Sequence, residues 1–438
     1  MEKRSKKGWL KTEKLLLQSV RILDPSSGRD ELGDILVEDG MISAVGSFGA
    51  GGGIDAQTVC GSGLVAIPGL VDMHVHLRDP GFTYKEDVLS GCRAAAAGGV
   101  TSLLAMPNTS PVTDRPEVVA GILQKAQQAD ARVYVAAAIT AGLKSEALSD
   151  LSALREAGVV AVSDDGRPVT DTRLMAEAMK LAPKLGLLVT AHCEDLYLAA
   201  GGIVNEGEVS RALGVKGIPA AAEDCGTARE IALAAAYGVP IHICHVSTAN
   251  SVALVRSAKR RGVKVTAETC PHYFMLTENA LLKRDADYRM NPPLRAEADR
   301  AAVIEGLMDG TLDAVATDHA PHSMEEKADF EKAPNGSIGM ETSLAAGIAA
   351  LVKPGYLTLA ALVEKMSCAP AKILGIDAGT LRQGAPADIA LIDAGKAWTV
   401  DETRLHGKSR NTPFKGMALT GKVKMTICRG KIVYRDEE

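Results

Sequence analysis

Nine histidines occur in the 438-residue chain, and several stand beside other residues that can bind a metal ion or move a proton. His74 and His76 are two positions apart, so on a β-strand both side chains point to the same face. Imidazole nitrogens are good ligands for zinc and similar metals. An isolated pair of this kind is structural as often as it is metal-binding. Polar residues at comparable positions strengthen the metal hypothesis: Asp164, Asp165, His192, His245 and Asp318.

Each of these residues lies in or just after a short apolar segment that has the composition of a buried strand. Eight such segments recur, mostly separated by helix-like, alanine-rich stretches: 70–76, 100–106, 132–139, 159–163, 187–192, 240–245, 264–269 and 313–318. This alternation is typical of a parallel sheet covered by helices. An open doubly wound sheet would alternate as well, but eight units over about 300 residues favour an α/β fold of the (β/α)8 TIM-type barrel class.

The two ends of the chain have a different pattern, with short β-rich runs between clusters of Gly, Asp and Pro. Neither end could bury a sizeable core alone, so we expect one small β-sandwich domain built from both chain ends. The predicted organisation is residues 1–66 for the N-terminal part of this β domain, 67–375 for the barrel and 376–438 for the C-terminal part.

The composition is that of an ordinary globular chain, with 46% hydrophobic and 24% charged residues. A net charge of −5 and an aromatic content of 3% predict no nucleic-acid partner. No segment reaches the roughly 18–20 apolar residues of a membrane helix, and a secretion signal is not expected. The eight cysteines are scattered without a CxxC pair, which favours a reduced, cytoplasmic protein.

In a barrel of this class the chemistry lies at the carboxyl ends of the strands. Four histidines with carboxylates suffice for a two-metal site, with ions roughly 3.5–4 Å apart. Asp318 can ligate a metal and accept a proton from water, although an isolated aspartate here would more simply cap a helix. Arg78 offers a fork of donors for a carboxylate, or a surface ion pair. Asn108 offers a donor and an acceptor, or a turn.

We predict no ligand or catalytic role for several other residues near these positions. Strand alternation or an odd offset turns three of them away from the candidate ligands, and we expect them to pack in the core: Cys193, His242 and Cys244. His272 is left unassigned. The polar segment 323–339 follows the last strand and is expected to cover the site as a loop, or to be a solvated connection.

Longer motifs carry a resemblance to a known family. The most specific are DMHVHLRDPG (72–81) and ATDHAPH (316–322). Further motifs extend the likeness over nearly the whole chain: AMPNTSP (105–111), SDDG (163–166), AHCED (191–195), ICHVST (243–248), AETCPHY (267–273), MNPPLR (290–295) and NTPFKGMALTGKV (411–423). In these motifs the sequence resembles the dihydroorotases of the amidohydrolase superfamily, and among them the long bacterial class I type.

The resemblance implies a zinc-dependent, reversible reaction of pyrimidine (UMP) synthesis, in which N-carbamoyl-L-aspartate cyclises to L-dihydroorotate and releases water. It implies one or two Zn²⁺ ions, held by His74, His76, Asp165, His192, His245 and Asp318. Asp318 would also move the proton between the attacking water and the departing nitrogen. The substrate would be held by His76, Arg78, Asn108, Asn291 and His322, with the backbone around Asn335 and Gly336 assisting.

One departure concerns the residue between the metals. Many amidohydrolases use a carboxylated lysine there, whereas SDDG offers only aspartate, and the choice of Asp165 over Asp164 rests on motif alignment. Two alternatives stay open: another cyclic amidohydrolase, such as allantoinase or dihydropyrimidinase, or a non-catalytic partner of aspartate transcarbamoylase. Arg78 favours dihydroorotate over uncharged rings. Besides the small-molecule substrate, the resemblance implies homo-oligomeric assembly and association with aspartate transcarbamoylase, and no membrane partner.

Overall fold

The computed structural model describes residues 14–48 and 55–437, and all eight predicted strands of the middle region are present. They form one parallel sheet of β6 (Leu70–Val75), β7 (Val100–Ala105), β8 (Arg132–Ala137), β9 (Ala161–Val162), β10 (Leu188–Ala191), β13 (Ile241–Ile243), β14 (Val265–Thr269) and β15 (Ala314–Val315). Val75 pairs in parallel with His319, and the backbone N–H of His76 donates to the His319 carbonyl at 2.8 Å. The last strand therefore returns to the first, and the barrel prediction is confirmed over the open sheet.

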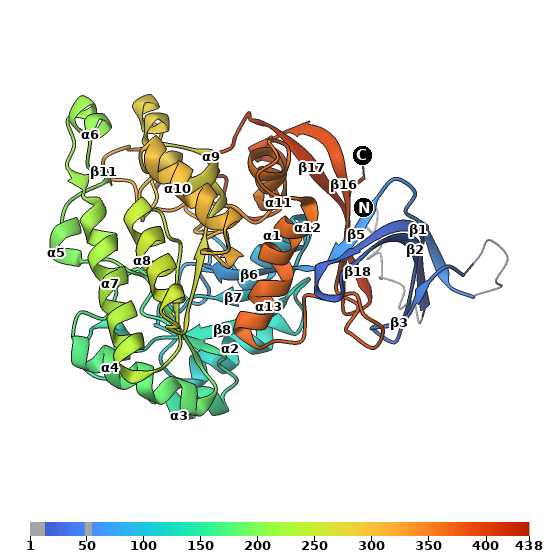
Figure 1. Ribbon diagram of the computed structural model, residues 1–438, viewed down its shortest axis with the longest axis horizontal. Helices are drawn as coiled ribbons and strands as arrows, with labels where there is room; N and C mark the ends of the chain where they lie inside the picture. Colours follow the sequence, from blue (N-terminus) through green and yellow to red (C-terminus); the bar gives the residue numbers. More distant parts are fainter. Residues whose placement is uncertain (1–13, 49–54, 438) are drawn as a thin grey trace, which may run out of the picture.

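Helices cover the outside of the barrel (Figure 1). They are α1 (Val88–Ala97), α2 (Pro116–Ala126), α3 (Leu151–Glu156), α4 (Thr172–Leu181), α5 (Leu196–Ala199), α6 (Glu208–Leu213), α7 (Ala220–Tyr237), α8 (Ala249–Arg260), α9 (Pro271–Met275), α10 (Glu297–Met308), α11 (Ser343–Gly347), α12 (Leu359–Val363) and α13 (Ala369–Leu374). A short parallel pair, β11 (Val204–Asn205) and β12 (Gly217–Ile218), lies between α5 and α7. Among the described residues, no helix is both long and apolar enough to cross a membrane.

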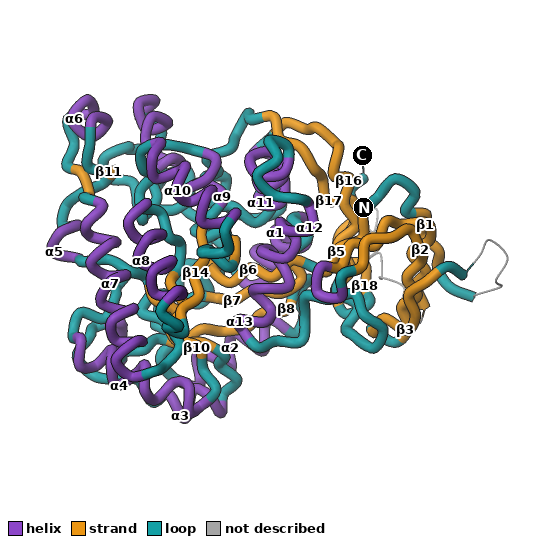
Figure 2. Tube along the Cα trace, in the orientation of Figure 1, coloured by secondary structure: helices purple, strands orange, loops and turns teal. Residues whose placement is uncertain are grey.

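Strands from both ends of the chain form a second sheet beside the barrel, here called the terminal sheet (Figures 1 and 2). It consists of β1 (Lys14–Asp24), β2 (Arg29–Glu38), β3 (Met41–Gly46), β4 (Gln57–Cys60), β5 (Val65–Pro68), β16 (Ile389–Thr399), β17 (Ala418–Cys428) and β18 (Lys431–Arg435). The two chain ends meet where β5 pairs antiparallel with β16. This confirms the prediction that both ends build one β domain.

The terminal sheet has its own apolar core. Side chains from its N-terminal strands and from β16 and β17 pack together in one buried cluster that includes Leu17, Ile35, Ile389, Leu391 and Ile427. The two layers of the predicted sandwich are thus two parts of one continuous hydrogen-bonded sheet. The change from terminal sheet to barrel falls between β5 and β6, while the domain limits at residues 66 and 375 stay predictions.

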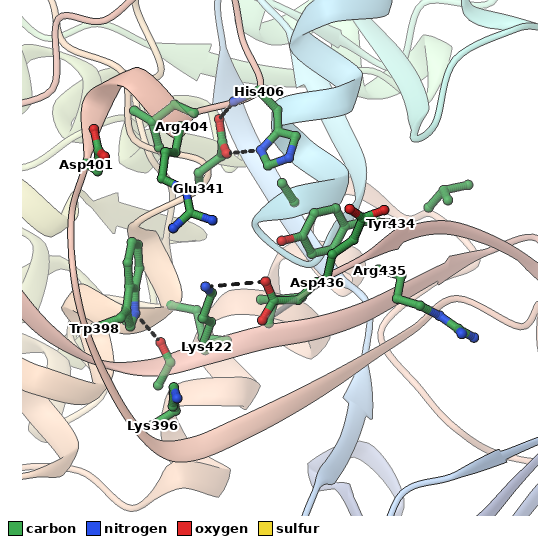
Figure 3. Close-up of a pocket in the computed structure, with 18 of the residues that line it drawn as sticks. Glu341, Lys396, Trp398, Asp401, Arg404, His406, Lys422, Tyr434, Arg435 and Asp436 are labelled. Atoms are coloured by element: carbon green, nitrogen blue, oxygen red, sulfur yellow. Dashed lines mark hydrogen bonds and ion pairs between the residues drawn. The ribbon is translucent and has the colours of Figure 1, made fainter. Parts of the chain in front are cut away.

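A cavity of about 1440 Å³ lies where the terminal sheet meets α1 and α11 (Figure 3). Several of its polar side chains are paired with one another. Glu341 accepts from His406 Nδ1 at 2.7 Å, and the indole N–H of Trp398 donates to the Gly421 carbonyl at 2.8 Å. None of the predicted site residues lines this cavity, so the candidate chemistry lies elsewhere.

Candidate active site

The predicted metal ligands gather inside the barrel at the carboxyl ends of its strands. His74 is in β6, and His76, Asp165, His192, His245 and Asp318 follow β6, β9, β10, β13 and β15. All six are buried. Arg78, His245 and Asp318 have φ values of 60°, 36° and 47°, a left-handed conformation that non-glycine residues seldom adopt. Such backbone strain concentrates at functional sites, and here it turns the chain at three strand ends.

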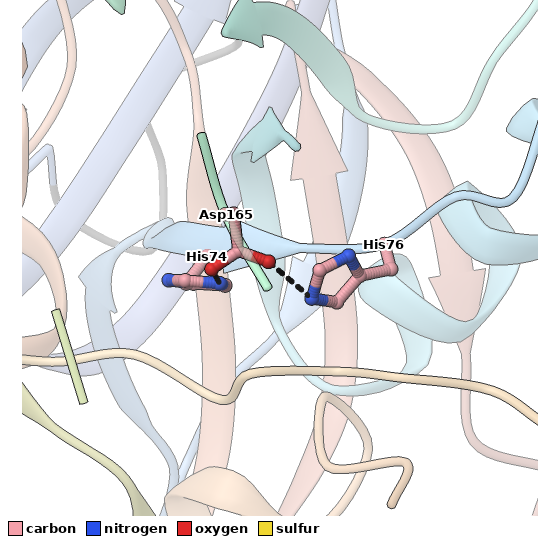
Figure 4. Close-up of side chains that lie close together, drawn as sticks. All are labelled: His74, His76 and Asp165. Carbon is pink, nitrogen blue, oxygen red and sulfur yellow. Dashed lines mark ion pairs between the residues drawn. The ribbon is translucent and has the colours of Figure 1, made fainter. Parts of the chain in front are cut away.

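The carboxylate of Asp165 is at the centre of this cluster. Its Oδ1 lies 3.2 Å from His74 Nε2, and its Oδ2 lies 3.5 Å from His76 Nε2 (Figure 4). The same Oδ1 lies 3.7 Å from both His192 Nδ1 and His245 Nε2. The candidate ligands thus divide into two groups that share Asp165, each with its ligand atoms within 4.8 Å of one another. One group contains His74 and His76, and the other contains His192 and His245.

Polar atoms of the cluster lack the partners that buried polar atoms normally have. His74 Nε2 and Asp165 Oδ1 are buried without a hydrogen bond. His192 Nδ1 and His245 Nε2 face each other at 3.0 Å, where two lone pairs would repel unless a cation or proton lay between them. Two ligands of a tetrahedral zinc at about 2.1 Å are separated by roughly 3.4 Å. The residues present therefore fit a metal ion.

The outward nitrogens of two candidate ligands face acceptors, which determines their tautomers. His76 Nδ1 lies 2.8 Å from Asn108 Oδ1, and His192 Nε2 lies 3.2 Å from Glu194 Oε2. Because these oxygens can only accept, the outward nitrogen of each ring carries the proton. The inward nitrogen of each ring then presents a lone pair to the cluster, as metal binding requires.

Asp318 completes the cluster. Its Oδ1 lies 3.1 Å from His76 Nε2 and 3.7 Å from His74 Nε2. Burial alone would raise the pKa of this carboxyl, but its contact with His76 and the other imidazoles nearby hold its pKa well below the ordinary value. Asp318 is therefore ionised at neutral pH and able to accept a proton.

Asp164 and Asp165 differ in direction although they are adjacent in sequence. Asp164 turns toward β8, where its Oδ1 accepts from the Thr140 N–H at 3.0 Å and its Oδ2 from the Thr140 hydroxyl. Burial raises the pKa of Asp164 to about 6 in spite of these bonds. Only Asp165 faces the histidines, which agrees with the choice made from the motif alignment.

The site also has a cationic side, formed by residues after β6 and β15. The Arg78 Nε donates to the Pro321 carbonyl at 3.2 Å, and its Nη2 lies 3.4 Å from His322 Nε2. His322 Nε2 also lies 2.9 Å from the Asn335 carbonyl, and its Nδ1 lies 3.2 Å from Lys85 Nζ. Burial, together with the charges of Arg78, Lys85 and Lys327, lowers the pKa of His322 to about 2. His322 is therefore neutral, with its proton on Nε2.

Comparison with known proteins defines the family. Profiles described as dihydro-orotase-like and amidohydrolase family match residues 63–251 and 340–434. The chain is 53% identical over 422 residues to a dihydroorotase from Geobacter sulfurreducens, covering 96% of this chain and 99% of that protein. A dihydroorotase from Syntrophus aciditrophicus is 47% identical over 426 residues, covering 97% of this chain and 100% of that protein. The chain belongs to the dihydroorotase family.

Solved structures similar to this dihydroorotase-family chain include other cyclic amidohydrolases. Dihydropyrimidinase from Brevibacillus agri has a TM-score of 0.85 at 27% identity, covering 97% of this chain and 96% of that one. L-Hydantoinase (dihydropyrimidinase) from Arthrobacter aurescens also has a TM-score of 0.85, at 26% identity and with the same coverage. The architecture of barrel and terminal sheet is therefore shared by enzymes whose names differ.

The remaining predicted substrate residues of the dihydroorotase-family site lie around the cluster of candidate ligands. The Asn108 side chain bridges two candidate ligands, because its Nδ2 donates to Asp165 Oδ2 at 3.3 Å while its Oδ1 accepts from His76. Asn291 contacts the candidate ligands through Glu194: it donates to Glu194 at 3.0 Å, and Glu194 faces His192. Gly336 has φ 136°, and a Cβ there would lie 2.7 Å from the Ala320 Cβ, so the close approach of this backbone requires glycine.

Several residues that organise this dihydroorotase-family site were not predicted. Lys327 is buried and donates to the carbonyls of Arg289, Pro334 and Gly336 at 2.9–3.3 Å, which fixes the segment 323–339 against the barrel. Asn411, from the C-terminal part of the chain, accepts from the His322 N–H and donates to the Gly336 carbonyl, both at 3.1 Å. No local pattern marks Lys327, and Asn411 begins the motif 411–423, to which no site role was assigned. The prediction that segment 323–339 lies against the site agrees with these contacts.

The prediction for Cys244 was wrong. Its sulfur lies within 4.8 Å of ligand atoms of His74 and Glu268, so the side chain faces the barrel interior. Strand alternation does not apply there, because β13 ends at Ile243 and the backbone turns at His245. Cys193 and His242 are buried, as predicted.

Proposed function

We propose that this chain interconverts L-dihydroorotate and N-carbamoyl-L-aspartate with the help of bound zinc. The observation that carries the proposal is the Asp165 carboxylate facing two pairs of histidines, with Asp318 beside them. Arg78 and His322 add a side of the same site that suits a carboxylate. Family membership supports this substrate, because relatives named dihydroorotase are about half identical to the chain over nearly all of its length.

His74, His76 and Asp165 would hold one zinc ion, and His192, His245 and Asp165 would hold a second. Imidazole nitrogens select zinc over magnesium or calcium, which prefer oxygen ligands. Zinc bound here supplies a nucleophile at neutral pH, by lowering the pKa of water to about 7, and polarises the carbonyl under attack.

Asp318 is the proposed proton carrier. In ring opening it accepts a proton from the attacking water as the water oxygen bonds to the ring amide carbon. The amide C–N bond then breaks, and Asp318 gives the proton to the departing nitrogen. Cyclisation follows the same steps in reverse. The low pKa of Asp318 keeps it ionised and ready to accept.

Arg78 is the proposed partner of the α-carboxylate of the substrate. Its guanidinium offers paired N–H groups that match the two carboxylate oxygens. His322 lies beside Arg78, and its Nε2–H donates to the Asn335 carbonyl, which holds the histidine against the backbone of Asn335 and Gly336. Asn108 contacts the candidate ligand His76, and Asn291 donates to Glu194, the acceptor beside the candidate ligand His192. The substrate is thereby oriented with its ring amide toward Asp165.

A second candidate function is the hydrolysis of an uncharged cyclic amide, because the fold is shared with dihydropyrimidinase and L-hydantoinase. Arg78 disfavours this candidate, since an uncharged ring would leave its half-buried guanidinium without a carboxylate. A non-catalytic role alone is disfavoured by the complete set of candidate ligands.

The test is hydrolysis of L-dihydroorotate by the purified chain, followed as ultraviolet loss of the ring amide after zinc is restored to chelated protein. We expect zinc-dependent turnover that Asp318→Asn removes, and little or no turnover of dihydrouracil or allantoin. Preference for dihydrouracil would replace the proposed substrate. Zinc binding without turnover of any of the three rings would contradict the catalytic proposal, once aspartate transcarbamoylase has been added without effect.

We also propose that copies of the chain associate with one another and with aspartate transcarbamoylase. Light scattering coupled to size-exclusion chromatography measures self-association, and co-elution with aspartate transcarbamoylase tests binding to that enzyme. A monomer that elutes alone would contradict both parts of this proposal.

A further inference from the structure

A buried carboxylate lies behind the candidate ligand His74 and has no part in the proposed function. Glu268 is in β14, in the middle of the apolar barrel, and is fully buried. Its Oε1 lies 3.2 Å from His74 Nδ1, the ring nitrogen that points away from Asp165. Isolated charges are seldom buried, because leaving water is costly without a charged or hydrogen-bonding partner. The surroundings of Glu268 must therefore supply donors.

The second partner of Glu268 is a histidine outside both ligand groups, in ion-pair contact with the other carboxylate oxygen. Glu268 Oε2 lies 3.2 Å from His242 Nε2, and His242 Nδ1 lies 2.8 Å from the Thr266 hydroxyl. His242 and Thr266 are partners in the register of β13 and β14, and His242 is buried. The carboxylate thus lies between two imidazoles in a row that runs from Thr266 through His242 and Glu268 to His74.

This row determines which nitrogen of His74 bears the proton. The carboxylate can only accept, so the Nδ1 of a neutral His74 donates to Glu268. The Nε2 lone pair is then directed at Asp165 Oδ1, 3.2 Å away, where no hydrogen bond forms. In the same way, Asn108 and Glu194 accept from the outward ring nitrogens of His76 and His192. Outer acceptors of this kind orient metal-binding histidines and raise their basicity.

We propose that Glu268 is a positioning residue for the metal centre, and that His242 acts on metal affinity through Glu268 without being a ligand. Glu268 holds His74 in the tautomer and orientation that metal binding needs, and His242 holds Glu268. This inference rests on the proposed function, because it requires a metal ion between His74 and Asp165.

A competing interpretation makes Glu268 itself a ligand. Ligand atoms of His74, Cys244 and Glu268 lie within 4.8 Å of one another and would form a separate metal site on the outer side of His74. Cys244 distinguishes the two interpretations. A positioning role leaves metal binding independent of its sulfur, whereas a ligand role does not.

The test measures zinc affinity by competition with a chelator, together with zinc per chain and the visible absorption of the cobalt-substituted protein. Substitution of an acceptor behind a metal ligand typically weakens metal binding about 10- to 100-fold. We expect a loss in this range for Glu268→Gln and a smaller loss for His242→Gln, with changed cobalt spectra. The double variant should bind zinc no more weakly than Glu268→Gln alone, because His242 acts through Glu268.

Glu230→Gln is the matched control, since Glu230 is also a buried carboxylate but lies on α7 and pairs with Arg229. Its zinc affinity should equal that of the unmodified chain. Thermal unfolding of the metal-free proteins verifies that each variant folds, and if Glu268→Gln does not fold, His242→Gln carries the test. Unchanged zinc affinity in these variants would overturn the positioning role, and loss of zinc in Cys244→Ser would favour the separate site. Absence of zinc binding by the unmodified chain would instead refute the proposed function.

Discussion

The part of the barrel mouth that holds the candidate metal ligands, here called the metal side, and the cationic side are built in different ways. The metal side uses residues in the strands or directly after them, and its central carboxylate faces four imidazoles within 3.2–3.7 Å. The cationic side uses loops after β6 and β15, held by Lys85, Lys327 and Asn411. Strand ends fix a metal site through the barrel geometry itself, whereas a substrate site on loops needs separate polar anchors.

The largest effect should come from Asp318, which lies among the candidate metal ligands and is the proposed proton carrier. Asp318→Asn removes the proton acceptor and should lower kcat for dihydroorotate by about 10²- to 10⁴-fold. Steady-state kinetics with zinc content measured in parallel gives the result. Asp313→Asn, at the start of the same strand segment, is the control and should retain turnover. Near-normal kcat in Asp318→Asn with full zinc occupancy would assign the proton transfer to another group.

Arg78 tests whether the cationic side selects the substrate. Arg78→Lys keeps the charge but loses the fork of donors, and we expect kcat/KM for dihydroorotate to fall roughly 10- to 100-fold, the range of hydrogen bonds to charged groups. Zinc content should not change, because Arg78 is no ligand. If the variant lost zinc as well, substrate binding on the cationic side and metal binding on the metal side would not be independent.

Lys327 tests the anchors of the loop side. Lys327→Met keeps much of the side-chain volume and removes three hydrogen bonds to backbone carbonyls. We expect KM for dihydroorotate to rise about 10-fold with little change in kcat, since roughly 1.4 kcal/mol of substrate orientation is lost. Zinc affinity should stay normal. Glu268→Gln should instead weaken zinc binding. If both variants changed KM and zinc affinity to the same extent, the two sides would not have the separate roles described above.

The smallest effect concerns the attachment of the C-terminal segment that carries Asn411. Asp87 caps α1 and lies 2.6 Å from Lys408 Nζ. Burial would raise the pKa of Asp87, but Lys408 and the Ser90 N–H bring it down to about 2. Since the unfolded value is about 3.9, the charged form stabilises the fold above pH 4, and this contribution is lost as the pH falls toward 2.

Asp87→Ala should therefore cost about 1 kcal/mol of stability at pH 7. Thermal unfolding midpoints at pH 7, 5, 4 and 3 check this, and the gap between the variant and the unmodified chain should narrow below pH 4. Lys408→Met removes the ion pair and the hydrogen bond to the Thr83 carbonyl but leaves the helix cap in place, and it should cost less. A gap that widens on acidification would contradict the assigned sign.

The sequence alone was sufficient to predict the strands of the barrel and the residues that gather on the metal side. Eight apolar runs matched the eight strands, because a strand buried on both faces needs continuous apolar residues, which show in a single sequence. The two-residue spacing of His74 and His76 placed both side chains on one face. The terminal sheet followed from the same patterns, since neither chain end could bury a core alone. Arg78 and Asp318 were found because they stand next to strand ends.

Other features depend on contacts between distant segments and leave no local pattern. Asp164 and Asp165 are the same residue type side by side, and the Thr140 donors in the segment after β8 decide which of them turns away from the histidines. Cys244 faces inward because the backbone turns at His245, which alternation cannot anticipate.

What the sequence determined by itself, then, is the set of strands and the chemical types at their ends, since both follow from local periodicity and side-chain chemistry. Tertiary structure decided which of these groups meet. Asn411 reaches Gly336 across 75 residues, and Glu268 reaches His74 across 194 residues. Closure of the barrel and packing of the terminal sheet bring these residues together, because a buried polar group takes its partner from whatever the fold places within hydrogen-bond distance.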